Sequence, residues 1–149
     1  VFQSKYLGDL IEKNEFDTAY HEHLSYFAVR PLIGLFHKFG MEIFDVKRFP
    51  IHGGTIRVYV KKKSSGLKIS NSVNELLELE KKIGLDKFDT YLQFAERVRK
   101  LKEDLVSILK KLKSEDKKII GYGAPAKGNT LLNYLRLKNL LKNYLNTLK

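Results

Sequence analysis

The spacing of apolar and polar residues changes along the first 60 positions, and each spacing predicts one kind of element. Four apolar residues recur at helical intervals between Pro31 and Gly40: Leu32, Leu35, Phe36 and Phe39. Proline is tolerated in a first helical turn and glycine commonly follows a last one, so a helix is predicted there. Apolar and polar residues then alternate over 41–46 and 55–60, which is the period of a strand. Because glycines separate these two segments, we expect an antiparallel pair.

Residues before and after this part follow other patterns. Residues 7–13 are predicted to form a short helix, and residues 14–25 an extended loop. A polar, basic segment at 61–68 contains the linker Ser64-Ser65-Gly66. Beyond it, apolar spacing predicts a helix over 71–83, closed by Gly84, and a longer one over 88–112. The apolar stripe of the longer helix is expected to be packing surface rather than part of a cofactor site.

The last part of the chain is predicted to contain a strand, a turn and a helix. Residues 118–122 have the apolar composition of a buried strand, and a turn rich in small residues follows them. A helix is expected from about Asn129 to Leu148. Taken together, the predicted elements indicate a helix-rich α/β fold.

Composition narrows the class of protein. The chain has 149 residues, 43% of them hydrophobic, and a mean hydropathy of −0.32. This length is ordinarily one domain, and no apolar run approaches the ~18 residues of a membrane span, so no membrane partner is expected. No signal peptide is visible, and the lack of cysteine is typical of a reducing, cytoplasmic compartment. Because the chain opens on Val1 instead of methionine, we expect a processed or excised piece of a longer protein.

The net charge of +11 belongs entirely to the second part of the chain. Residues 1–60 carry seven basic and seven acidic side chains, whereas residues 61–149 carry 21 basic and 10 acidic ones. Most of these lysines alternate with acids at helical spacing, which favours solvated helix faces over a surface for polyanions. The last 33 residues contain no acid at all, so this tail would attract phosphates.

The first candidate for chemistry is the sequence Tyr20-His21-Glu22-His23. Its phenol, two imidazoles and carboxylate can all hold or pass a proton, and an imidazole braced by a carboxylate can act as a general base near neutral pH. In an extended backbone, His21 and His23 would point to one side and Tyr20 and Glu22 to the other. A metal site is not expected because no third ligand has suitable spacing. Two interpretations stay open: imidazoles hydrogen-bonded to nearby backbone, or a general base.

The second candidate is a glycine-containing loop. The pattern Gly121-x-Gly123-x-x-Ala126, between a predicted strand and a predicted helix, has the context of a dinucleotide fingerprint. Glycines allow the backbone to approach a phosphate, and a helix N-terminus presents N–H groups to it. The acid expected about 20 positions later is missing, however, and the loop is not a P-loop. A tight turn and a phosphate contact both stay open, and the candidate substrate-binding residues are Gly121, Gly123, Ala124, Lys127, Gly128 and Asn129.

Three segments in fixed order carry a resemblance to a known family. They lie at 14–27, at 44–46 with 51–60, and at 121–134, and they read NEFDTAYHEHLSYF, FDV with IHGGTIRVYV, and GYGAPAKGNTLLNY. Together they closely resemble the sugar C-methyltransferase family, whose members use S-adenosylmethionine to methylate a carbon of nucleotide-linked keto-deoxysugars. The similarity extends from about residue 5 to about residue 135.

This resemblance implies a domain organisation and a cofactor. Members have a zinc-binding N-terminal domain, a class I methyltransferase domain and a Rossmann-like C-terminal domain. By resemblance, residues 1–63 correspond to the distal part of the methyltransferase domain, with its last helix and hairpin. Residues 64–117 correspond to a helical connector, and residues 118–149 to the first strand, turn and helix of the C-terminal domain. The implied cofactor is S-adenosylmethionine, and the implied substrate is a nucleotide-sugar.

The resemblance also implies roles for the candidate residues. In the family a base removes the proton beside the sugar ketone, and the resulting enolate attacks the activated methyl group. Carried onto this chain, His23 is the base, and Glu22 and Tyr20 orient it or bind the ketone oxygen. The chemistry is consistent with an enolate's need for a neutral base and a hydrogen-bond donor. The loop at 123–129 would face the nucleotide-sugar diphosphate.

Departures from the family pattern limit what the chain is expected to do alone. It has no acidic-Gly-x-Gly-x-Gly loop for S-adenosylmethionine and no cysteines for zinc, and after Tyr134 it continues as a basic, leucine-rich segment. A doubly wound domain cannot close around one strand and one helix. We therefore expect an incomplete molecule, without methyl transfer of its own, that associates with itself or with the missing part of the enzyme.

The alternative hypothesis is a basic, non-catalytic module that binds nucleic acid or another polyanion. It depends on the charge surplus and the acid-free tail. No recognised nucleic-acid motif accompanies them, and aromatic residues are not interleaved with the basic runs, so a nucleic-acid partner is not favoured.

Overall fold

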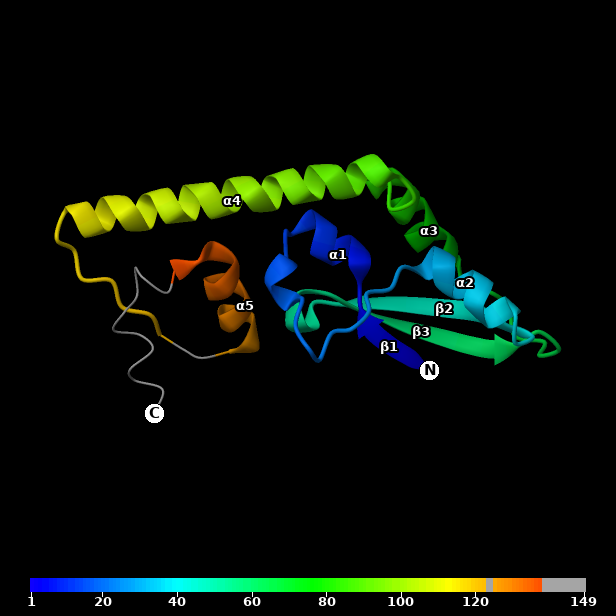
Figure 1. The fold of residues 1–149 in the computed structure, drawn as a ribbon. Helices are drawn as coiled ribbons and strands as arrows, with labels where there is room; N and C mark the ends of the chain where they lie inside the picture. Colours follow the sequence, from blue (N-terminus) through cyan, green and yellow to red (C-terminus); the bar gives the residue numbers. More distant parts are fainter. Residues whose placement is uncertain (123–124, 138–149) are drawn as a thin grey trace. The chain divides into compact units, whose positions relative to one another are not determined.

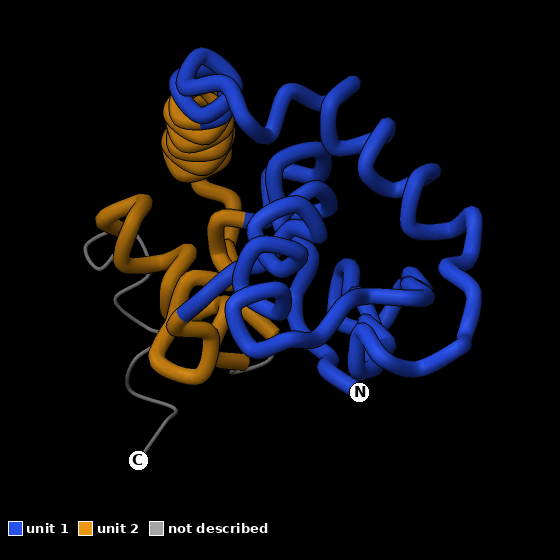
Figure 2. The backbone as a smooth tube through the Cα atoms, turned by 90° about the vertical axis from the view of Figure 1, so that its right-hand side faces the viewer, with its two compact units in different colours: residues 1–15, 25–94 blue, residues 16–24, 95–149 orange. Residues whose placement is uncertain are grey.

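The computed structural model describes residues 1–122 and 125–137 (Figure 1). Contacts divide the chain into two compact units (Figure 2). Unit 1 comprises residues 1–15 and 25–94, and unit 2 comprises residues 16–24 and those from 95 onward. Unit 2 is therefore assembled from two segments that lie far apart in the sequence.

Unit 1 contains a three-stranded antiparallel sheet. The predicted pair is confirmed as β2 (Met41–Phe49) and β3 (Thr55–Lys62), with a register shift between Ile43 and Asp45. A third strand, β1 (Phe2–Lys5), pairs with the other edge of β3 and gives the order β1-β3-β2. Four residues are too few for alternation to stand out, so the sequence pattern did not predict β1.

Three helices accompany this sheet in unit 1: α1 (Leu7–Glu12), α2 (Val29–His37) and α3 (Asn71–Ile83). Helices α2 and α3 contact β2 and each other. The core between them is aliphatic except for one tyrosine: Tyr6, Val29, Leu32, Ile43, Val46, Ile56, Val58, Val73 and Leu76. The stripe predicted for α2 is only partly internal, since Leu32 is buried while Leu35 and Phe39 are exposed.

Both ends of α3 are capped, and the closing glycine is the predicted one. Ser70 precedes the helix, and its hydroxyl accepts a hydrogen bond from the Ser72 N–H, as an N-cap residue does. Gly84 ends the helix in the left-handed conformation, with φ of 78°. The next helix, α4 (Phe88–Ser114), has nearly the predicted bounds. Of its residues only Val98 is fully buried, so the stripe that was expected to be packing surface is mostly half-exposed.

The predicted strand at 118–122 is wrong. These residues form no regular element, and Ile120 and Tyr122 are exposed by 75% and 104%. A strand needs a neighbour to bond its N–H and C=O groups, and the strands of the described residues all belong to unit 1. The Rossmann-like description of residues 118–149 is therefore not confirmed, whereas the small α/β fold is.

The last described helix also differs from its prediction. Helix α5 is Ala126–Leu135; it starts three residues before Asn129, and Arg136, whose φ is 55°, follows its last residue. Pro125 immediately precedes it and supplies a fixed φ that suits a helix start. Residues 138–148 of the predicted helix lie outside the described residues. Each helix in the described part of the chain is too short or too polar to span a bilayer.

Candidate active site

The histidine-containing segment of unit 2 is a compact turn and not the extended loop predicted for 14–25. It begins with a 3-10 helix at Phe16–Thr18. Backbone N–H groups of Tyr20 and His23 then donate to the carbonyls of Thr18 and Tyr20, at 3.1 and 2.8 Å. These bonds fold the chain back on itself, so the predicted alternation of side chains on two sides is wrong as well. Side chains three residues apart can now meet.

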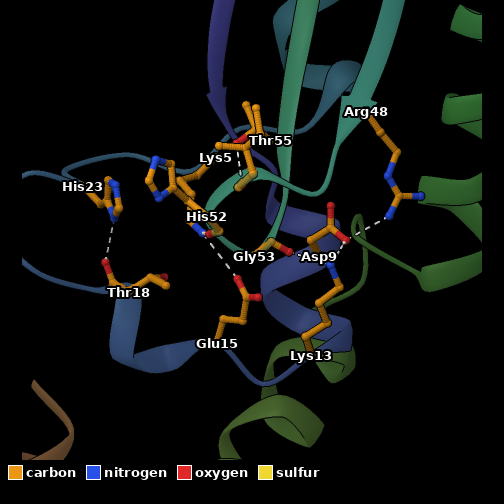
Figure 3. A network of polar contacts seen from close by, with 11 residues as sticks. Lys5, Asp9, Lys13, Glu15, Thr18, His23, Arg48, His52, Gly53 and Thr55 are labelled. Atoms are coloured by element: carbon orange, nitrogen blue, oxygen red, sulfur yellow. Dashed lines mark hydrogen bonds and ion pairs between the residues drawn. The ribbon is translucent and has the colours of Figure 1, made fainter. Parts of the chain in front are cut away.

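The turn holds the His23 imidazole by one of its own carbonyls. Nδ1 of His23 lies 3.0 Å from the Thr18 carbonyl oxygen (Figure 3). A carbonyl oxygen can only accept a hydrogen bond, so Nδ1 must carry the proton. In the neutral ring with this tautomer, the lone pair is on Nε2. Nε2 is then the nitrogen that can accept a proton from a substrate. The two open interpretations of this histidine are thus compatible, because the backbone hydrogen bond defines the tautomer of the base.

Tyr20 is the predicted partner that lies against His23. The two ring centroids are 4.6 Å apart, with the planes tilted by 47°. Both side chains are partly buried. The phenol and the imidazole are therefore held together within one turn.

His21 and Glu22 are exposed residues of the turn, and the His21 ring lies 5.9 Å from the Tyr20 ring between centroids. Their side chains are 82% and 67% exposed, and His21 Nε2 lies 3.9 Å from Glu22 Oε1. A contact between side chains as exposed as these contributes little free energy. The structure thus places the Glu22 carboxylate beside His21, and its predicted role in orienting His23 stays a prediction.

The second predicted motif lies at the start of α5. Lys127 and Gly128 lie in the first turn of the helix, where backbone N–H groups have no partner within the helix, whereas the N–H of Asn129 donates to the Pro125 carbonyl at 3.3 Å. Lys127 and Gly128 are partly buried, and Asn129 is exposed. Gly121 is exposed and lies in the irregular segment, while Gly123 and Ala124 lie outside the described residues. The predicted phosphate contact stays a prediction.

Unit 2 brings these two motifs together. Helix α5 packs on the 3-10 helix at 16–18, and the rings of Phe16 and Tyr134 lie 5.0 Å apart between centroids. The Lys102 ammonium of α4 lies 4.7 Å from the centroid of the Tyr134 ring, at cation–π distance. One compact unit therefore contains both the turn that carries His23 and helix α5. These two segments are more than 100 residues apart in the sequence.

A metal centre has no support in the described part of the chain. No group of three or more histidine, cysteine, aspartate or glutamate side chains is arranged there to hold a metal ion. The residue that sequence reasoning missed is Thr18, which is fully buried and acts through its backbone. Every residue has a backbone carbonyl, so the sequence does not indicate which one bonds His23, and only the folded turn shows it.

Sequence reasoning also missed a charged network in unit 1 (Figure 3). Lys5 Nζ lies 3.3 Å from Glu15 Oε2, with the lysine side chain only 6% exposed. Asp9 Oδ1 lies 2.7 Å from Lys13 Nζ and 2.9 Å from Arg48 Nη2. This network lies beneath the turn that joins β2 to β3. Asp9 and Lys13 are four residues apart, a spacing that predicts a pair on a helix, but the other members are scattered over the chain and no spacing rule would have grouped them.

A pocket of about 380 Å³ lies in unit 1, apart from the predicted residues. Most of its lining is apolar, and Glu80 forms part of its wall: Leu7, Ala28, Arg30, Pro31, Glu80, Leu85, Asp86 and Tyr91. The Glu80 carboxylate accepts hydrogen bonds from the N–H groups of Val29 at 2.6 Å and Arg30 at 3.1 Å, at the start of α2. Burial raises the pKa of this carboxyl, and the two N–H groups oppose that effect. The carboxylate therefore caps a helix.

Comparison with known proteins identifies a family that this chain resembles in sequence. Residues 50–147 match the family described as the C-methyltransferase C-terminal domain. The chain is also 35% identical over 127 residues to the C-methyltransferase NovU of Streptomyces niveus. That alignment covers 85% of this chain and 30% of the relative, so the chain spans under a third of the length of the protein it matches.

Proposed function

Because the chain belongs to the C-methyltransferase family, we propose that it is part of an enzyme that methylates a carbon of a nucleotide-linked keto-deoxysugar. The observation that carries this proposal is the His23 imidazole, whose Nδ1 proton is directed to the Thr18 carbonyl and whose ring lies against Tyr20. This arrangement suits removal of a proton from a carbon next to a ketone.

The proposed step is a proton transfer from carbon to the imidazole. Nε2 of His23 accepts the proton from the carbon beside the sugar ketone, and the C–H electron pair moves into the enolate. The imidazolium that forms still donates from Nδ1 to Thr18, and a hydrogen bond from a charged donor is stronger than one from a neutral donor. The Tyr20 hydroxyl would donate to the ketone oxygen, where negative charge develops.

S-adenosylmethionine is the cofactor that the family implies, and it would supply the methyl group. The residues of this chain do not fit it. The sequence has no acidic-Gly-x-Gly-x-Gly loop, and Gly53 and Gly54 face the carboxylates of Glu15 and Asp9, which fill the space where a Cβ would lie. We therefore derive no step through the cofactor and assign to this chain the proton transfer on the sugar.

The rest of a longer enzyme is the partner in this proposal. The segment 118–122 leaves Ile120 and Tyr122 exposed, and the relative extends well beyond the aligned part. Large apolar side chains in one exposed segment are typical of surfaces that another part of a protein covers. The domain boundaries at 63 and 117 stay predictions, because the compact units divide the chain differently.

A basic binding module is the weaker alternative. Among the described residues, part of the surplus charge already has partners within the chain. Arg99 Nη1 lies 2.6 Å from Glu96 Oε1, and Lys102 lies over the Tyr134 ring. Net charge alone supports association with polyanions in general and does not define a site.

The test is exchange of the sugar's acidic proton with deuterium, which needs no methyl donor. The chain is incubated in D2O with a thymidine-diphosphate keto-deoxysugar, and loss of the proton beside the ketone is followed by NMR. We expect the wild type to speed this exchange and His23→Asn to slow it by roughly 100-fold or more, the usual contribution of a general base.

The matched control is His21→Asn, which changes the exposed histidine of the same turn and should leave the exchange rate unchanged. Equal rates for the wild type and His23→Asn, or no exchange above the rate without protein, would contradict the proposal.

A further inference from the structure

The pocket of unit 1 is formed by residues of four helices and of the loop that follows α3. Leu7 comes from α1, Pro31 from α2, Glu80 from α3 and Tyr91 from α4. Every residue that lines it belongs to unit 1, so one compact unit defines the whole pocket. Its volume of about 380 Å³ is within the usual range for small-molecule sites, roughly 300–1,000 Å³.

Tyr91 brings an aromatic ring to the mostly apolar wall of this pocket. Its hydroxyl donates to the Leu85 carbonyl at 2.7 Å, so the polar end of the side chain is already bonded to the backbone. Burial also raises the pKa of the Tyr91 phenol, which therefore stays neutral at physiological pH. What this residue offers to a ligand is its ring.

Glu80 places a buried carboxylate in the same wall. The residue is 2% exposed, and its oxygens accept hydrogen bonds from the N–H groups of Val29 and Arg30. Burial raises the pKa of this carboxyl, whereas the two N–H groups and the neighbouring Tyr6 hydroxyl lower it. A carboxylate has about four acceptor positions. Even when all three of these donors are counted, one position remains for a donor from the pocket.

The charge at the pocket is opposite in sign to that of the chain. Two carboxylates, Glu80 and Asp86, and one guanidinium, that of Arg30, belong to the lining, whereas the whole chain carries +11. Arg30 and Asp86 are exposed, so water screens their charges, while the charge of Glu80 is shielded from water and acts more strongly on a neighbour. The wall therefore favours a cation and disfavours an anion.

Helix capping explains only part of this arrangement. A cap needs one side-chain oxygen beside the first N–H groups of a helix, and a short polar side chain at the surface usually supplies it. The cap accounts for the hydrogen bonds of Glu80 to Val29 and Arg30. It does not account for the open apolar space beside a buried carboxylate, whose removal from water costs free energy. A cationic ligand in the pocket would offset that cost.

We propose that this pocket binds a small organic amine, whose ammonium group donates to the Glu80 carboxylate and whose apolar body packs against Leu85 and the Tyr91 ring. This inference goes beyond the proposed function and does not depend on it, because the pocket belongs to unit 1 and the candidate active site to unit 2. Carboxylates and aromatic rings are both favourable partners of an ammonium group. A phenyl ring with a short chain fits the space, since a cavity of about 150 Å³ already holds benzene.

The test compares three probes of nearly equal size that differ in their polar end: phenylpropylamine, phenylpropanol and phenylpropionate. Each is titrated into the full chain at neutral pH, and the methyl signals of Leu7, Ala28 and Leu85 are followed by NMR. We expect saturable shifts with the amine, at a Kd of roughly 1 mM or below. The alcohol should bind roughly tenfold more weakly, because it lacks the charge-assisted hydrogen bond, and the carboxylate should not bind.

Two variants locate the amine within the pocket. Leu85→Trp fills part of the space with an indole, so the saturable shifts of Leu7 and Ala28 should disappear. Leu92→Trp is the matched control, because Leu92 lies on α4, is 48% exposed and does not line the pocket. It should bind the amine as the wild type does. Equal binding by both variants would place the amine outside the pocket and overturn the inference.

A third variant tests the carboxylate itself. Glu80→Gln keeps the shape of the side chain and removes its charge, so the amine should bind roughly tenfold more weakly while the alcohol binds within about twofold of the wild type. Melting curves show whether the variant folds, and the comparison of the three probes on the wild type needs no variant at all.

The outcomes with the wild type decide the inference. Equal affinity for the amine and the alcohol would show a pocket that recognises only apolar groups, and it would overturn the assignment of a cation. Tighter binding of the carboxylate would reverse the assigned charge. No shift with any of the three probes would show that the pocket takes no small ligand, and the proposed role of His23 would be unaffected.

Discussion

At the scale of single residues, backbone groups decide what two titratable side chains do. The Thr18 carbonyl defines the tautomer of His23. The N–H groups of Val29 and Arg30 donate hydrogen bonds to the buried carboxylate of Glu80. In both pairs the side chain is visible in the sequence and its partner is not. The two cases differ in solvation, because Glu80 is 2% exposed whereas His23 is partly exposed.

The Glu80 carboxyl makes a prediction about pH. Burial raises its pKa in the folded state above the value of 4.5 for a solvated glutamate. Below pH 4.5 both states hold the proton, and above it the unfolded state releases the proton first. Stability from this group therefore falls as pH rises, by at most about 1.4 kcal/mol per pH unit. Because the amide of a Glu80→Gln variant does not titrate, the stability advantage of the wild type over the variant should shrink as pH rises from 4.5 towards neutrality.

Urea unfolding of the wild type and of Glu80→Gln at several pH values measures the difference in their free energies of unfolding. The titration of all other groups cancels in this difference. Since both proteins share every other carboxylate, a difference that stayed constant or widened with pH would show that the folded pKa of Glu80 is not raised.

At the scale of elements, one glycine of unit 1 follows the end of a helix and another lies inside a helix. Gly84 follows α3 with φ of 78°, and a Cβ there would lie 2.8 Å from the Thr90 hydroxyl oxygen. Gly34 lies inside α2 and has nothing within 4 Å of its Cβ position. The same substitution should therefore act in opposite directions at these two positions.

Gly84→Ala is expected to lower the free energy of unfolding by about 1–2 kcal/mol, because alanine is strained in the left-handed region. Gly34→Ala is expected to raise it by about 0.4–1 kcal/mol, because alanine restricts the unfolded chain and favours a helix. Midpoints of urea unfolding measure both changes. A loss of stability in Gly34→Ala, or none in Gly84→Ala, would mean that these backbone conformations are not as described.

At the scale of the whole molecule, the candidate active site depends on two distant segments that form unit 2. The described contact between them is aromatic, with Phe16 before the histidine turn and Tyr134 near the end of α5. Aromatic pairs contribute about 0.5–1.5 kcal/mol beyond the area they bury. Helix α5 has ten residues, which is too short to be stable alone in water, so this packing has to stabilise it.

Phe16→Ala should therefore loosen α5. Amide hydrogen exchange at 126–135 is expected to become roughly three- to tenfold faster, whereas exchange in α3 stays unchanged. Phe88→Ala removes an exposed phenylalanine, 74% accessible, and is the matched control with no expected effect on α5. Unchanged exchange at 126–135 in Phe16→Ala would show that this ring does not support the helix.

Features that depend on neighbours along the chain could be predicted without the fold. Local spacing and local motifs predict the pair β2 and β3, the bounds of α3 with its closing Gly84, and the membership in a C-methyltransferase family. Alternation, helical periodicity and capping act over a few residues, so they are legible in the order of residues alone.

Features whose partners lie far away or belong to the backbone became visible only in the folded chain. Strand β1 forms because β3 offers it an edge, and the segment 118–122 forms no strand because unit 2 offers it none within the described residues. The charged network of unit 1 and the Thr18 carbonyl that bonds His23 also became visible only in the folded chain. Hydrogen bonds and burial are satisfied in three dimensions, and the order of residues does not specify which distant group will satisfy them.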